Sequence, residues 1–205
     1  MAAILTNLRN TVIAGSVLAL ALAVLSLTVW GDLIRPFWPF LFRWAHVISG
    51  VMWIGLLWYF NFVQIPTMPS IPDEQKPAIG KHIAPAALFW FRWGAMSTIV
   101  TGLILAMLNG YIVPALTLGL AGGTTGQMMI GLGMWLGAIM WFNVWFIIWP
   151  NQQKALNIAN RHPDLAADDK AKAARTAMLF SRTNTLLSFP MLFCMVAAQS
   201  LFGIS

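Results

Sequence analysis

Residues 43–55, RWAHVISGVMWIG, decide the fold class, because they begin a run of apolar residues that continues to Val63. Such a run is long enough to cross the ~30 Å hydrocarbon core of a bilayer as a helix. An ionisable side chain inside it is costly and needs a partner. Helical spacing puts Arg43, His46, Gly50 and Trp53 on one face. The stretch therefore predicts a membrane-spanning helix that forms one wall of a buried site.

The composition of the whole chain indicates an integral membrane protein. Of its 205 residues, 59% are hydrophobic and 9% are charged, and the mean hydropathy is +0.74. We expect one all-α helical bundle over residues 1–205, with five spans at about 11–30, 40–63, 88–108, 127–149 and 177–202. The last span is the most polar. We expect the first span to be a retained signal-anchor helix, because no small-x-small cleavage site follows its apolar run.

The distribution of lysine and arginine predicts the orientation. With a cytoplasmic N-terminus, ten of these residues lie on the cytoplasmic side and two, Arg35 and Arg43, on the other. This bias is typical of cytoplasmic loops, so we expect the N-terminus inside and the C-terminus outside, in a bacterial cytoplasmic membrane. The net charge of +6 then needs no nucleic-acid partner, and the lipid bilayer is the expected surrounding.

The arrangement around His46 suits a haem b. The imidazole would bind the iron, Gly50 leaves room for a flat ring, and Arg43 would meet a propionate. Gln199, from the last span, is expected to reach the depth of His46, and Trp53 to line the interior. The alternative is that His46 hydrogen-bonds a neighbouring helix while Gly50 allows close helix packing. The sequence leaves both interpretations open.

Other ligands for such a haem are scarce. His82 and His162 are expected at the opposite membrane face, too far from His46 to share one iron with it. The single cysteine, Cys194, and the lack of any C-x-x-C-H within the 205 residues predict no c-type haem. A second polar cluster is expected where Asn143 or Asn151 meets Asn184 and its neighbours.

Four stretches resemble the membrane domain of the bacterial membrane-bound urate oxidase family. They are HVISGVMWIGLLWYFNF, FWFRWGAMSTIVTGLILA, IMWFNVWFIIWPNQQKAL and RTNTLLSFPMLFCMVAAQ, in the order in which the family has them. The resemblance covers roughly residues 40–200, and NVWFIIWPNQQK is its most specific piece. It implies a multi-helix membrane domain that acts with a cytochrome c.

This chain also differs from the family's pattern at several positions. The family tends to have histidine where this chain has Thr183 and Gln199, and an acidic residue where it has Gly94. His46 is the membrane histidine that this chain keeps. We therefore do not expect this chain alone to oxidise urate.

Two functions remain for comparison with the structure. One is a membrane redox module, with a haem b or a quinone contact at Arg43, His46, Gly50, Trp53 and Gln199, that passes electrons to a separate cytochrome. The other is an accessory subunit that packs against other chains of a larger respiratory or photosynthetic complex. A transporter is disfavoured, because no acidic residue lies within any expected span and no internal repeat is visible.

Overall fold

The structure is a computed structural model that describes residues 2–29, 34–120 and 122–204. No β-strand occurs among these residues, as the all-α prediction requires. The chain divides into two compact units, Met1–Leu41 and Phe42–Ser205. The first contains α1 (Ala2–Leu5), α2 (Leu8–Val29) and the start of α3 (Ile34–Trp58). Within it, the Thr11 hydroxyl donates to the Ile4 carbonyl at 2.8 Å and links α1 to α2.

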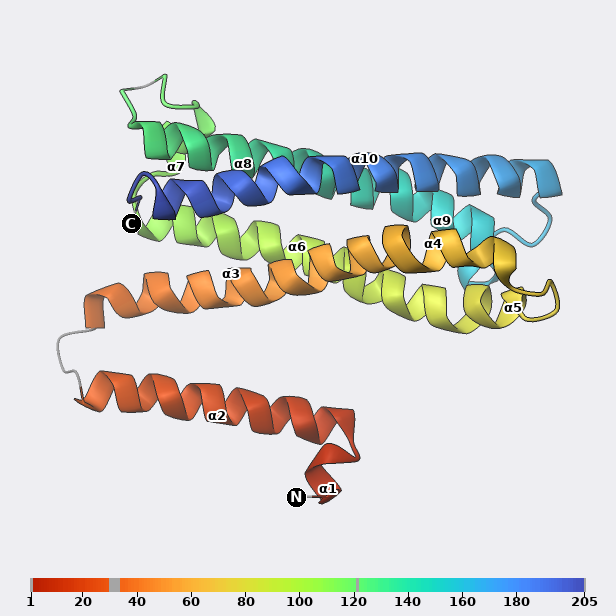
Figure 1. Cartoon of the computed structure of the whole chain (residues 1–205), viewed down its shortest axis with the longest axis horizontal. Helices are drawn as coiled ribbons and strands as arrows, with labels where there is room; N and C mark the ends of the chain where they lie inside the picture. Colours follow the sequence, from red (N-terminus) through yellow and green to blue (C-terminus); the bar gives the residue numbers. More distant parts are fainter. Residues whose placement is uncertain (1, 30–33, 121, 205) are drawn as a thin grey trace. The chain divides into compact units, whose positions relative to one another are not determined.

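The second unit is a bundle built on long helices. The remainder of α3 lies beside α6 (Ala84–Leu108), α8 (Thr125–Phe142) and α10 (Ala167–Ser200) (Figure 1). Shorter segments extend and connect these helices: η1 (Tyr59–Gln64), α4 (Ile65–Thr67), η2 (Met68–Ser70), α5 (Lys76–Ala78), η3 (Ile79–Ile83), α7 (Ile112–Leu116), η4 (Asn143–Ile148), α9 (Trp149–Leu156) and η5 (Ile158–Asn160).

Three of the short segments are π-helical, and each comes just before a proline. η1 precedes Pro66, η3 precedes Pro85 and η4 precedes Pro150. Proline lacks an N–H and its ring clashes with the carbonyl four residues earlier, and a wider turn relieves this clash. The prolines therefore begin new helical turns instead of ending helices. This explains why residues 64–85 are mostly helical despite their prolines.

Four helices in the described part of the chain are long and apolar enough to cross a membrane. They are Leu8–Leu25, Phe37–Ser70, Lys76–Leu108 and Thr125–Leu156. They correspond to the first four expected spans, although residue 30, the expected end of the first, lies outside the described residues. The protein is therefore a membrane protein by helix length and composition.

The expected fifth span is the last part of a longer helix. α10 begins at Ala167, ten residues before the expected start, and does not reach the same apolarity as the other four. Its polar side chains are buried: Ser181 is 7% exposed, and Asn184 and Ser188 are fully buried. Its outward face carries Leu186, Phe189, Phe193 and Val196, all more than half exposed. The mean hydropathy of α10 is therefore low because of its buried polar residues, although its outer face is apolar.

Asparagine side chains hold α10 against the helix that contains α8 and η4. Asn143 Nδ2 donates to Asn184 Oδ1 at 2.8 Å, and Asn184 Nδ2 donates to the Met140 carbonyl at 2.9 Å. The predicted meeting of Asn143 with Asn184 is confirmed. Asn151 instead donates to the Ile147 carbonyl of its own helix.

Replacing Asn184 by alanine should lower the free energy of unfolding by about 1 kcal/mol, the size measured for hydrogen bonds between membrane helices. The physical reason is the buried Asn143 amide, which loses its acceptor. The measurement is unfolding of the detergent-solubilised protein in a denaturing surfactant. Thr183→Ala is the matched control, because Thr183 is exposed and bonds only within α10. Equal stability of the two variants would contradict this role of Asn184.

Candidate functional site

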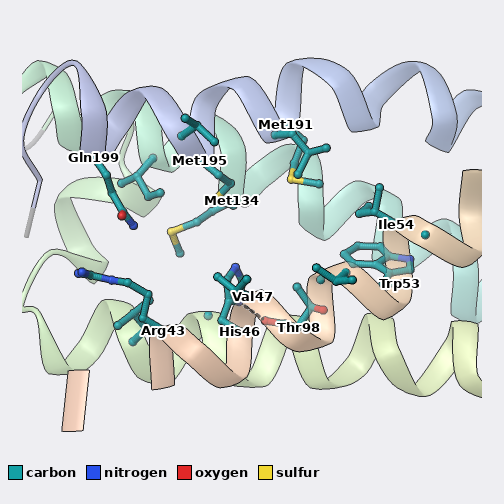
Figure 2. A pocket seen from close by; sticks show the side chains of 18 of the residues that line it. Arg43, His46, Val47, Trp53, Ile54, Thr98, Met134, Met191, Met195 and Gln199 are labelled. Atoms are coloured by element: carbon teal, nitrogen blue, oxygen red, sulfur yellow. Dashed lines mark hydrogen bonds between the residues drawn. The ribbon is translucent and has the colours of Figure 1, made fainter. Parts of the chain in front are cut away.

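A cavity of about 580 Å³ lies inside the second unit, between α3 and α6 on one side and α8 and α10 on the other (Figure 2). Its volume is in the range of sites for cofactors and other small molecules, roughly 300–1,000 Å³. Residues predicted from the sequence to share a site all line it: Arg43, His46, Gly50, Trp53 and Gln199. The structure therefore brings together residues separated by more than 150 positions in the chain.

His46 is held in place by a backbone carbonyl of α6. Its Nδ1 lies 2.9 Å from the Thr98 carbonyl oxygen (Figure 2). A helical side chain covers the turn that precedes it, so the residue that would cover this carbonyl is residue 102. That residue is glycine, and a Cβ there would lie 2.8 Å from Cε1 of His46. The contact of His46 with Thr98 thus depends on the absence of a side chain at Gly102.

This hydrogen bond defines the tautomer of the imidazole. A carbonyl oxygen only accepts, so Nδ1 carries the proton and donates it to Thr98. Nε2 then carries a lone pair. In the part of the chain that the structure describes, no hydrogen bond engages Nε2, while His46 lines the cavity. Histidines that bind metals are commonly oriented in this way by a carbonyl on the second nitrogen.

A second hydrogen bond ties α3 to α6 next to His46. The hydroxyl groups of Ser49 and Ser97 lie 2.8 Å apart. Together with the bond between His46 and Thr98, it fixes α3 against α6 over about one helical turn. The imidazole therefore belongs to a rigid wall and not to a mobile loop.

Glycines leave the wall around His46 bare. A Cβ at Gly50 or Gly55 would meet no atom within 4 Å, and both residues line the cavity. Of the alternative interpretation, the hydrogen bond from His46 to a neighbouring helix is confirmed, whereas Gly50 does not serve close helix packing. It leaves open space beside the imidazole, as the interpretation as a site requires.

Trp53 is a buried part of the cavity wall. Its side chain is 1% exposed, and α6 packs closely on its backbone, since a Cβ at Gly94 would lie 3.3 Å from the Trp53 nitrogen. An acidic side chain at position 94, as in the family that the sequence resembles, would have to push α3 away. The glycine is therefore part of how this chain packs α3 on α6.

The other end of the cavity is polar. α6 ends at Leu108, Gly110 adopts a left-handed conformation with φ +71°, and the Tyr111 N–H returns to the Ala106 carbonyl at 3.1 Å. This turn brings Tyr111 to the cavity that Arg43 and Gln199 also line. Burial raises the pKa of the Tyr111 hydroxyl, while the neighbouring Asn109 and the positive charge of Arg43 oppose the rise. The shift favours the protonated hydroxyl, which can donate a hydrogen bond.

Arg43 has no counter-ion among the described residues. Its Nε is buried without a hydrogen-bond partner. The two ion pairs among the described residues are formed by Lys76 and Lys172, and neither includes Arg43. Figure 2 shows the side chains of Arg43 and Gln199 extending toward the same end of the cavity. The arrangement offers a guanidinium, an amide and a phenol to an anionic or carbonyl group of a ligand.

Helix levels show that Gln199 is not opposite His46. Ala106, Ile130 and Ala198 form one buried cluster with Tyr111, and Gln199 follows Ala198 directly. His46 packs on Gly102, which is one turn, ~6 Å, from Ala106 in the direction away from Gln199. The expectation that Gln199 reaches the depth of His46 is therefore wrong by about one turn.

The remaining histidines lie away from the cavity, as the sequence predicted. His82 is exposed in η3, and the backbone N–H of His162 donates to the Asn157 side chain at 2.8 Å. Neither lines the cavity with His46. Thr183, where the family tends to have histidine, is exposed and donates to the Leu179 carbonyl.

The residues of the site that the sequence did not predict include Thr98, Gly102, Tyr111 and Met134. Thr98 acts through a carbonyl, which every residue has, so no sequence pattern marks it. Gly102 and Met134 resemble ordinary residues of apolar helices. Tyr111 did carry a signal, because it is one of two tyrosines in the chain and follows an Asn-Gly turn.

Comparison with known proteins supports the resemblance drawn from the sequence. Residues 123–203 match the family model described as "Urate oxidase N-terminal". The matched segment contains α8, α9 and α10, and therefore Met134 and Gln199 but not His46. The resemblance to the N-terminal domain of urate oxidase is confirmed over these residues. Searches among curated proteins and among solved structures found no similar chain.

Replacing Gly102 by alanine should destabilise the protein by about 1–3 kcal/mol relative to Gly50→Ala, the usual cost of overpacking. Both substitutions add one methyl group to a helix that lines the cavity. At Gly102 the methyl group would overlap the imidazole, whereas at Gly50 it meets open space. Thermal unfolding in detergent, followed by circular dichroism, measures the difference. The geometry of the His46 wall is refuted if the two variants unfold at the same temperature.

Proposed function

We propose that this chain is a membrane-embedded electron-transfer subunit that holds a haem b in the cavity, with His46 as an axial ligand. The observation that carries the proposal is the orientation of His46. Its Nδ1 is engaged by the Thr98 carbonyl at 2.9 Å, so that Nε2 remains free as a ligand on the cavity side.

The cavity fits such a group in its shape and in its polarity. Its walls are mainly apolar side chains from α3, α8 and α10, which suits a macrocycle with hydrophobic faces. Gly50 and Gly55 leave bare wall near the imidazole. The cation of Arg43, without a carboxylate partner among the described residues, lies at the polar end with Tyr111 and Gln199, where propionates would be neutralised.

Each residue then has a distinct task. His46 would hold the iron, and Thr98 would fix the imidazole ring and its tautomer. Arg43 would pair with a propionate, with Tyr111 and Gln199 as hydrogen-bond donors. Apolar walls around the iron would exclude water and thereby affect its potential. Haem, when bound, supplies one-electron chemistry between its ferrous and ferric states, which suits transfer of one electron to a ferric cytochrome.

The proposal includes five spans in the cytoplasmic membrane of a bacterium, with the N-terminus inside. α10 would be the fifth, because its polar residues are buried and its outer face is apolar. The basic residues support the orientation. Lys76 and Lys81 lie near α5, and Lys154, Arg161 and Lys170 near α9 and the start of α10. These segments lie at one end of the bundle, opposite the end at which α10 finishes at the C-terminus (Figure 1).

The test is the absorption spectrum of the detergent-purified protein, oxidised and reduced, with a pyridine haemochrome assay of haem per chain. We expect a b-type spectrum at about one haem per chain, with His46→Ala losing most of the haem because the iron loses its protein nitrogen. His82→Ala is the matched control, since His82 is exposed in η3 outside the cavity. It should retain the full haem content.

A colourless protein, purified with haem available in the cells, would overturn the proposal. Bound quinone in such a preparation would assign the cavity to a quinone contact. A colourless protein that co-purifies with other membrane chains would favour the accessory-subunit alternative. Haem that persists in His46→Ala would exclude His46 as the ligand.

A further inference from the structure

Three methionines share the cavity with His46. Met134 comes from α8, and Met191 and Met195 come from α10. A thioether is an uncharged sulfur ligand on a flexible side chain with three rotatable bonds. Haem iron accepts the combination of one histidine and one methionine as axial ligands. The question is which of the three sulfurs faces the imidazole.

Met134 is at the level of His46. It lies one helical turn beyond Ile130 on α8, as Gly102 lies one turn beyond Ala106 on α6 in the antiparallel direction, and Ile130 and Ala106 belong to one buried cluster. His46 packs on Gly102. The two side chains therefore enter the cavity at about the same depth and from opposite walls. Figure 2 shows Met134 extending from α8 toward His46.

The other two methionines have different positions. Met191 is 5% exposed and packs in the cluster that contains Trp53 and Leu57. Met195 packs against α8, since a Cβ at Gly133 would lie 3.2 Å from its methyl carbon and 3.4 Å from its sulfur. Gln199 lies at the polar end beside Arg43. Met191 and Met195 thus have packing partners of their own, whereas helix geometry puts Met134 at the depth of His46 on the opposite wall.

We propose that Met134 Sδ is the second axial ligand, so that the iron is bound by His46 Nε2 from α3 and by Met134 from α8. This inference rests on the proposed function. It assigns the sixth position of the iron to a thioether and leaves Gln199 for the propionate end. The iron would then join two helices that the cavity otherwise separates.

The experiment compares Met134→Ala, Met134→His, Met195→Ala and Gln199→Ala in the full-length, haem-loaded protein. The wild-type ferric haem should be low-spin and show the weak far-red band of sulfur-to-iron charge transfer. Met134→Ala should keep its haem through His46 but become high-spin, lose that band and bind carbon monoxide when reduced. Met134→His should return to low-spin with a lower reduction potential, because methionine ligation raises the potential.

Met195→Ala should keep the low-spin spectrum of the wild type. Gln199→Ala removes a proposed partner of a propionate and is expected to lower the haem content, but the haem that remains bound should stay low-spin with its far-red band. The assignment is overturned if Met134→Ala remains low-spin with its far-red band, or if either of the other two substitutions produces the high-spin form. Such a result would leave the haem at His46 intact. The complete absence of haem from the wild type would instead refute the proposed function, and this assignment with it.

Discussion

The hydrogen bond from His46 Nδ1 to the Thr98 carbonyl is the interaction on which the site depends. It joins α3 to α6, sets the imidazole tautomer and directs the second nitrogen into the cavity. It forms because residue 102 is glycine and leaves the carbonyl of the preceding turn uncovered. The absence of a side chain at position 102 thus gives a costly polar group within an apolar helix a hydrogen-bond partner and a fixed orientation.

Buried polar side chains occur in two different arrangements in the bundle. Asn143 donates to Asn184, and Asn184 donates to the Met140 carbonyl, so these buried amides are partnered within the protein and contribute to helix packing. Arg43 has a buried Nε without a partner at the end of a cavity lined mostly by apolar residues. The first arrangement is closed and structural. The second is incomplete within the described chain, as expected for a binding site.

The sequence predicted much of this because membrane constraints are strong. The apolar runs located the four spanning helices, and helical spacing placed Arg43, His46, Gly50 and Trp53 on one wall. The sequence did not predict features that depend on contacts between helices. The π-helical turns that come before Pro66, Pro85 and Pro150 have no distinctive sequence pattern. Gln199 was placed too deep, and neither a backbone carbonyl at Thr98 nor a methionine at Met134 has a distinctive pattern.

The central claim is that a histidine nitrogen of this chain binds an iron inside the bundle. Electron–nuclear double resonance of the oxidised protein, grown with ¹⁵N-histidine, tests it most directly. The account predicts one strongly coupled histidine nitrogen on the haem iron, because His46 is the histidine in the cavity. A spectrum with no coupled histidine nitrogen, or with two, would contradict it.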